Sequence, residues 1–253
     1  MKKMVLISSV VKELSEMSKI EETSVATYAR ALREAGLLSQ KGRGRGAAHA
    51  TPLDAARLLI ALMVGGKVKD SPQAVRDFGK MRCTEHLHNK EMNWKDTSLQ
   101  FLCGVPNEHI YEEAIAAIIE GFGVREFQEK LKAETEKTKS PYLPVIMALI
   151  QDTKLQGQVI IGNYRYSYQV TEFIDVKHNS INDLENYDED VAERWLAILE
   201  RYSSGINREA EVGTPQFINI GQVLAGVREP GERETNEEWA DLPKQSLRKA
   251  DKI

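Results

Sequence analysis

The sequence has little of what marks secreted, membrane-bound or disulfide-stabilised proteins. Only two of its 253 residues are cysteines, too few for a disulfide framework. No apolar run reaches the roughly 18 residues that span a bilayer. A short apolar stretch near the amino terminus ends at Lys12 and Glu13, too early for the core of a signal peptide. We therefore expect a cytoplasmic protein without a membrane segment.

The signature motifs of common catalytic sites are also missing. The chain has no Gly-x-Ser-x-Gly elbow, no Gly-x-x-x-x-Gly-Lys-Ser/Thr phosphate loop and no His-Glu-x-x-His pair. The nearest approach, Gly65-Gly66-Lys67, lacks the following hydroxyl and the preceding strand. Carboxylates are so common, at 38 Asp and Glu residues, that no pair stands out as a general acid and base. We expect a protein that is not an enzyme and that holds no cofactor.

Charge is unevenly distributed along the chain. The whole chain has a formal net charge of −4, whereas its first fifty residues hold nine basic and five acidic side chains, a net charge of +4. A basic segment in an otherwise acidic protein is the electrostatic footprint expected of a nucleic-acid-binding surface.

Two short helices are predicted within this basic segment. Apolar residues recur at helical spacing from Val5 to Met17, and the pattern breaks at residues 18–20. A second helix is predicted over Ser24 to Ala35, capped by Thr23 or Ser24 and ended by Gly36, which can adopt a left-handed conformation. Its outer face carries Thr27, Arg30, Arg33 and Glu34.

A basic, glycine-rich loop follows at once, with the sequence Lys-Gly-Arg-Gly-Arg-Gly from Lys41. Glycines let the backbone approach a groove, and the guanidinium groups of Arg43 and Arg45 can grip phosphate or enter a narrow minor groove. The same run could be an ordinary flexible loop. Its position directly after the second helix favours the DNA interpretation.

The helices and loop together resemble the winged helix-turn-helix families of transcription regulators, over roughly the first quarter of the chain. The matching positions are Leu14, Glu16, Ser24, Val25, Tyr28, Leu32, Ala35, Gly36, Leu37 and Leu38. Two features depart from the family pattern. Lys19 stands in the turn where Gly is common, and Glu21 and Glu22 stand where Ser and Arg are common. The two carboxylates suit the helix dipole but would repel a nearby phosphate.

The resemblance implies a transcription regulator, of the phage, prophage or bacterial kind, that binds double-stranded DNA as a homodimer. The residues expected to contact DNA are Lys19, Ser24, Thr27, Arg30, Arg33, Lys41, Arg43 and Arg45. The alternative is an interaction protein, such as an assembly or DNA-packaging adaptor, whose winged helix binds another protein without sequence-specific regulation.

The rest of the chain predicts a helical middle and a mixed carboxyl-terminal part. Thr51, Pro52 and Asp54 are typical of a helix start. Further helices are expected from Ser71, from Asn107 or Glu108, over Glu126 to Lys139 and over Val191 to Tyr202. Strands are expected at Val159 to Ile161, at Tyr164 to Val170 and over Phe217 to Ile220, the last running into a short helix at Val223 to Val227.

These elements favour an α+β fold with a winged helix-turn-helix at the amino terminus and a small antiparallel sheet near the carboxyl terminus. We divide the chain into a DNA-binding domain (1–68), a helical region (69–140), an effector or dimerisation region (141–228) and a flexible charged tail (229–253).

Three further groups of residues have open interpretations. Tyr164, Tyr166 and Tyr168 alternate along one strand and could bind a ligand, stack bases or form a dimer interface. Burial of this face against the helix of Trp195 is favoured. Cysteine and histidine side chains that could hold structural zinc are Cys83, His86, His88, Cys103 and His109. The acidic residues of 183–190 are expected to be a solvated loop and helix start rather than a calcium site.

Overall fold

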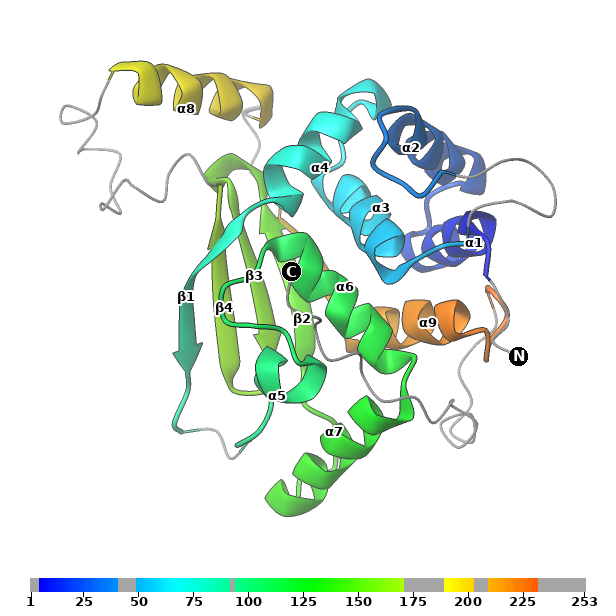
Figure 1. Ribbon diagram of the computed structural model, residues 1–253, viewed down its shortest axis with the longest axis vertical. Helices are drawn as coiled ribbons and strands as arrows, with labels where there is room; N and C mark the ends of the chain where they lie inside the picture. The colour runs from blue at the N-terminus through cyan, green and yellow to red at the C-terminus, as the bar shows by residue number, and fades with distance from the viewer. Residues whose placement is uncertain (1–4, 41–48, 92–93, 171–188, 203–208, 232–253) are drawn as a thin grey trace.

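The computed structural model describes residues 5–40, 49–91, 94–170, 189–202 and 209–231. Its elements are α1 (Ile7–Ser18), α2 (Glu22–Glu34), α3 (Pro52–Val64), the short 3-10 helix η2 (Val68–Asp70), α4 (Ser71–Gly79), β1 (Arg82–His88), α5 (Leu99–Cys103), α6 (Tyr111–Phe122), α7 (Arg125–Thr138), β2 (Ile146–Gln151), the 3-10 helix η3 (Asp152–Lys154), β3 (Gln156–Ile161), β4 (Tyr164–Gln169), α8 (Glu189–Tyr202), β5 (Glu209–Gly213) and α9 (Thr214–Ala225). The mixed α+β class and the small antiparallel sheet expected from the sequence are confirmed (Figure 1).

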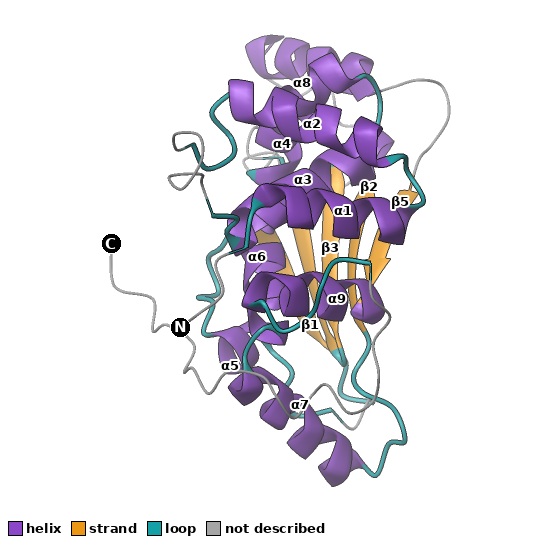
Figure 2. Cartoon of the chain, turned by 90° about the vertical axis from the view of Figure 1, so that its right-hand side faces the viewer, coloured by secondary structure: helices purple, strands orange, loops and turns teal. Residues whose placement is uncertain are grey.

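The five strands form one antiparallel sheet in the order β1-β4-β3-β2-β5. Successive side chains of a strand point to opposite faces, and along β2 and β3 every second residue is buried. Ala148 of β2 lies opposite Val159 of β3, which in turn lies opposite Tyr166 of β4. These buried residues form the face on which the helices stack, and α1, α3, α6 and α9 lie in front of it in Figure 2.

The amino-terminal helices share the core of the sheet. Buried side chains of α1, α2 and α3, among them Val10, Leu32 and Leu58, belong to the same apolar cluster as Ile118 of α6 and Val159 of β3. Helix α3 packs on α6, and α1 packs on α9. The four segments proposed from the sequence remain a prediction, but the described residues of the first three contribute to a continuous core.

Strand β1 corrects the expectation that residues 69–140 are helical. It is the edge strand of the sheet, and six of its seven residues are exposed. A strand that is exposed on both faces does not need apolar residues at every second position. The sequence after Met81 therefore lacks the alternating pattern from which a strand is predicted. Its pairing partner, the tyrosine-rich β4, supplies the apolar side chains.

The last predicted strand is wrong, since Phe217, Ile218 and Ile220 lie on α9. The helix begins at Thr214-Pro215, where a proline is tolerated in the first turn, and ends before Gly226 with a φ of +73°. The strand lies just before it, as β5, in which only Val212 is buried. Charged residues alternate with small ones there, so the strand lacked an apolar signature.

Several helix starts were predicted with mixed success. Thr51 caps α3 as expected, in a reciprocal pair with Asp54. Ser71 does not cap α4 but lies inside it, and its hydroxyl donates to the Val68 carbonyl at 2.7 Å. Helix α6 begins at Tyr111, later than expected, because residues 109 and 110 bond to the start of β1.

Helix α8 lies at the end of the sheet, beside α4 (Figure 1). Its last turn is held by Asp77 of α4, whose carboxylate accepts hydrogen bonds from Arg201 and from the Tyr202 hydroxyl, both at 2.7 Å. Most of the predicted tail, residues 232–253, lies outside the described residues. Across the described segments, no helix is long and apolar enough to cross a membrane.

Candidate nucleic-acid interface

The predicted helix pair is present as α1 and α2, which pack against each other across buried Val10, Leu14, Val25 and Leu32. Lys19 makes the turn between them in a left-handed conformation, with a φ of +58°. Two hydroxyls tighten this turn. Ser15 donates to the Ile20 carbonyl at 2.7 Å and Ser18 donates to the Leu14 carbonyl at 2.6 Å. The pair therefore adopts a defined turn despite having lysine where glycine would adopt this conformation most readily.

The predicted side-chain cap of α2 is wrong. The helix begins at Glu22, so Thr23 and Ser24 lie within its first turn, and no side chain caps it. The carbonyl of Thr23 instead accepts a hydrogen bond from the Thr27 hydroxyl at 2.7 Å. Glu22 in the first turn complements the positive end of the helix dipole. Thus the start of this helix is acidic and lacks a hydroxyl cap.

All described residues predicted to contact DNA are exposed. Lys19, Ser24, Thr27, Arg30 and Arg33 lie on the turn before α2 or on its solvent-facing side. Arg30 forms an ion pair with Glu34 at 2.8 Å, in which 76% and 66% of the two side chains are exposed. Ion pairs this exposed contribute little to stability, because water screens the two charges. Arg30 could therefore exchange this carboxylate for a phosphate at little cost.

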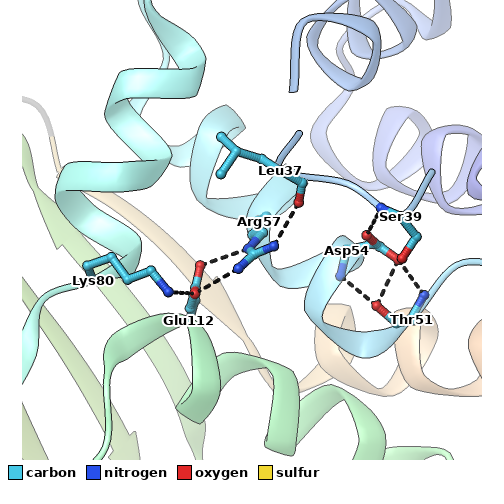
Figure 3. A network of polar contacts seen from close by, with 7 residues as sticks. All are labelled: Leu37, Ser39, Thr51, Asp54, Arg57, Lys80 and Glu112. Carbon is cyan, nitrogen blue, oxygen red and sulfur yellow. Dashed lines mark hydrogen bonds and ion pairs between the residues drawn. The ribbon is translucent and has the colours of Figure 1, made fainter. Parts of the chain in front are cut away.

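A single buried carboxylate, that of Asp54, holds both ends of the basic loop. The Ser39 amide and hydroxyl donate to Asp54 at 2.7 and 2.8 Å, and the Thr51 amide and hydroxyl donate to it at 2.8 and 2.7 Å (Figure 3). On the returning side, the Ala50 amide donates to the Val5 carbonyl at 2.8 Å. The segments that enter and leave the loop are thus both fixed to the start of α3. Lys41, Arg43 and Arg45 themselves lie outside the described residues.

A second buried carboxylate, Glu112 of α6, connects this region to the sheet side of the core. Its side chain is 2% exposed and accepts two hydrogen bonds from Arg57 of α3, at 2.9 and 3.0 Å, and one from Lys80 at 2.5 Å. Arg57 also donates to the Leu37 carbonyl at 2.8 Å, just before the loop (Figure 3). Burial alone would raise the pKa of Glu112, but the hydrogen bonds from Arg57 and Lys80 outweigh it and lower that pKa.

Sequence reasoning missed Arg57 and Glu112 as supporting residues because their partners lie far apart in the chain. It also missed three exposed cations beside α2, namely Lys67, Lys69 and Arg76. Helix α2 packs against both η2 and α4, which carry or adjoin these side chains. Their spacing along the chain gave no signal, since only the fold brings them next to the predicted recognition helix.

The tyrosines of β4 face the core, in line with the packing interpretation. Tyr166 and Tyr168 are buried, and the Tyr166 hydroxyl accepts from the Leu99 amide at 2.9 Å. Tyr168 packs edge-on against Tyr111, with ring centroids 5.1 Å apart. These partners come from α5 and α6 rather than from α8, the helix of Trp195. The buried rings are not available as an open platform for stacking bases.

The candidate zinc ligands have other roles. His86 and His88 stack on the tyrosine rings of β4. His109 contacts the Tyr168 hydroxyl at 2.6 Å and the Pro106 carbonyl at 2.7 Å, and burial lowers its pKa. Burial also raises the pKa of the Cys103 thiol. Within the described parts of the chain, no group of three His, Cys, Asp or Glu side chains could hold a metal ion. Most of the acidic segment 183–190 lies outside those parts.

The exposed side of α2 and the two fixed ends of the basic loop therefore form the candidate interface. No protein-family model, no curated protein and no solved structure matches this chain.

Proposed function

We propose that this protein binds duplex DNA through α2 and the basic loop that follows it, as a transcription regulator of the phage or bacterial kind that acts as a homodimer. The observation that carries the proposal is the fixing of both loop ends, at Ser39 and Thr51, to the single carboxylate of Asp54. The two ends of the loop are thereby held near the exposed cations of α2, where the proposal requires the loop to meet DNA.

In the proposed mechanism, α2 enters the major groove. The helix has 13 residues, which gives it a length of about 20 Å. An α-helix with its side chains is about 10–12 Å across and fits the major groove of B-DNA. Thr27, Arg30 and Arg33 contact base edges or the neighbouring backbone. Lys19 and Lys41 contact phosphate, while Arg43 and Arg45 reach the adjacent minor groove or its phosphates.

The first test measures binding to a fluorescent duplex by anisotropy at two salt concentrations. One duplex has random sequence, and the other carries DNA from beside the protein's own gene. We expect tighter binding to the second duplex. The Arg43→Ala, Arg45→Ala double variant should lower the salt dependence by about two units, roughly one for each phosphate that is no longer neutralised.

A matched control removes two cations far from α2. Lys90 and Lys132 are exposed, and they lie near the end of β1 and on α7, at the opposite end of the molecule from α2 (Figure 1). The Lys90→Ala, Lys132→Ala variant loses the same charge and should bind as the wild type does. Equal losses in both double variants would show that net charge alone governs binding. No binding of folded wild-type protein to either duplex would refute the DNA proposal.

The adaptor alternative has one observation in its favour. Glu21 and Glu22, both exposed, lie where α2 begins, and like-charge repulsion there opposes approach of a phosphate. If neither duplex is bound, the same exposed surface of α2 becomes the surface to test against protein partners.

A further inference from the structure

The turn between α3 and α4 lies against one flank of α2. Gly65 and Gly66 both have positive φ angles, +67° and +83°, and so reverse the chain after α3. The Tyr28 hydroxyl of α2 donates to the Gly66 carbonyl at 2.8 Å. Helix α2 also packs against η2 and α4 (Figures 1 and 2). The residues that follow the two glycines are therefore held beside α2.

Three exposed cations lie on this turn and on α4. Lys67 and Lys69 come directly after the glycines, and Arg76 extends from α4 to the end of α2, where its guanidinium donates to the Ala35 carbonyl at 3.3 Å. Two carboxylates lie nearby. Glu34 already pairs with Arg30 at 2.8 Å, and Asp70 is exposed within η2. The cations outnumber the carboxylates on this flank.

The basic loop begins on the other flank of α2. At 100° per residue, Arg33 lies roughly 140° from Tyr28 around the buried side of the helix, and therefore roughly 220° from it around the exposed side. The carbonyl of Arg33 accepts from the Gln40 side chain at 2.7 Å, at the point where the described chain enters the loop. Thr27 and Arg30 lie between the two flanks. Helix α2 is thus exposed along a central strip with basic groups on both sides.

We infer that Lys67, Lys69 and Arg76 form a second phosphate-binding rim, which contacts the DNA strand opposite to the one approached by the basic loop. The inference rests on the proposed function of α2. A helix of about 10–12 Å diameter fills a major groove of about 12 Å. Groups on its two flanks then meet the two sugar-phosphate backbones that border the groove. Phosphate contacts of this kind position the helix without reading sequence.

The test uses the random-sequence duplex, because phosphate contacts do not depend on sequence. Each contact contributes about 0.9 to the slope of log affinity against log salt. We expect Lys67→Ala, Lys69→Ala to lower the slope by about two units and to weaken binding at low salt. The charge-conserving Lys67→Arg, Lys69→Arg variant should keep the wild-type slope. The Lys90→Ala, Lys132→Ala variant serves as the charge-matched control.

The outcomes separate this inference from the proposed function. If the wild type binds and the arginine residues of the basic loop matter, but the Lys67, Lys69 variant keeps the wild-type slope, the second rim is wrong and the DNA proposal stands. If the Lys90→Ala, Lys132→Ala control lowers the salt slope by the same amount, the inference of a second phosphate-binding rim is also wrong. If the wild type binds no duplex, both ideas fail together. Circular dichroism of each variant verifies that the fold is retained.

Discussion

At the scale of single residues, the turn between α1 and α2 holds one residue in a strained backbone conformation that the fold tolerates. Lys19 adopts a left-handed conformation with a φ of +58° and a ψ of 23°. A residue with a Cβ loses roughly 1–2 kcal/mol in this region relative to the right-handed one. The exposed side chain of Lys19 lies at the turn that precedes the proposed recognition helix, where its charge can meet a phosphate.

We therefore expect Lys19→Gly to stabilise the fold and weaken DNA binding. Release of the left-handed strain, reduced by the greater freedom of glycine in the unfolded chain, should add about 1 kcal/mol to the free energy of unfolding. Urea titration measures this change. The control is Lys19→Ala, which removes the same charge but keeps the strain, so it should bring no gain in stability. A gain of equal size in both variants would show that charge, and not conformation, is responsible.

At the scale of elements, Glu112 ties three helices and a loop together. Its carboxylate is bound by Arg57 of α3 and by Lys80 just after α4, and Arg57 also binds the Leu37 carbonyl. Breaking a buried pair by removing one partner costs about 3–5 kcal/mol, because the other charge is left without compensation. This network fixes the position of α3, and with it the Asp54 carboxylate that holds the basic loop.

The network predicts a loss of stability in acid. The pKa of Glu112 in the folded protein is lowered from its ordinary value. The Glu112 carboxylate therefore stabilises the folded protein fully at pH values above the pKa that it has in the unfolded chain. This stabilisation is lost as the pH falls through the lower pKa that it has in the folded protein. We expect Glu112→Gln to be less stable at neutral pH, with a difference from the wild type that shrinks as the pH is lowered past that range. Thermal unfolding at a series of pH values measures this. A difference that is independent of pH would contradict it.

At the scale of the whole molecule, segments from the two ends of the described chain meet. Arg228, which follows α9, forms an ion pair with Glu13 of α1 at 2.6 Å, and the two side chains are 1% and 2% exposed. The Gly231 amide donates to the same carboxylate at 2.9 Å. The segment after α9 thereby lies on α1, the helix against which α2 packs. The helices that carry the candidate interface are therefore held in part by a contact between residues more than 200 positions apart in the chain, Glu13 and Gly231.

Removing either partner of this pair should destabilise the protein more than removing both. Arg228→Met alone leaves the buried Glu13 carboxylate without its ion-pair partner, and Glu13→Gln alone removes the carboxylate that Arg228 binds. Breaking a buried pair in this way costs about 3–5 kcal/mol. The double variant leaves neither charge buried. Its loss in free energy of unfolding should therefore be smaller than the sum of the losses in the two single variants. Urea unfolding of all four proteins measures the coupling. Strictly additive losses would show that the pair does not act as a unit.

Much of the secondary structure could be predicted because its signals are local. Apolar side chains at helical spacing predicted α1, α2 and α7, the Thr51 and Asp54 pair predicted the start of α3, and alternating tyrosines predicted β4. Strands β1 and β5 were missed because an edge position leaves few apolar residues to reveal them. The winged-helix resemblance and the homodimer remain predictions.

The sequence by itself determined the positions of helices such as α1, α2, α3 and α7, and where basic charge accumulates, since these properties depend on neighbouring residues. Only the tertiary structure decided that Asp54 holds both ends of the basic loop and that Glu112 binds Arg57 and Lys80. It also decided that Lys67, Lys69 and Arg76 flank α2. These relations join residues that are distant in the chain, so they arise only when burial of one shared core brings the elements together.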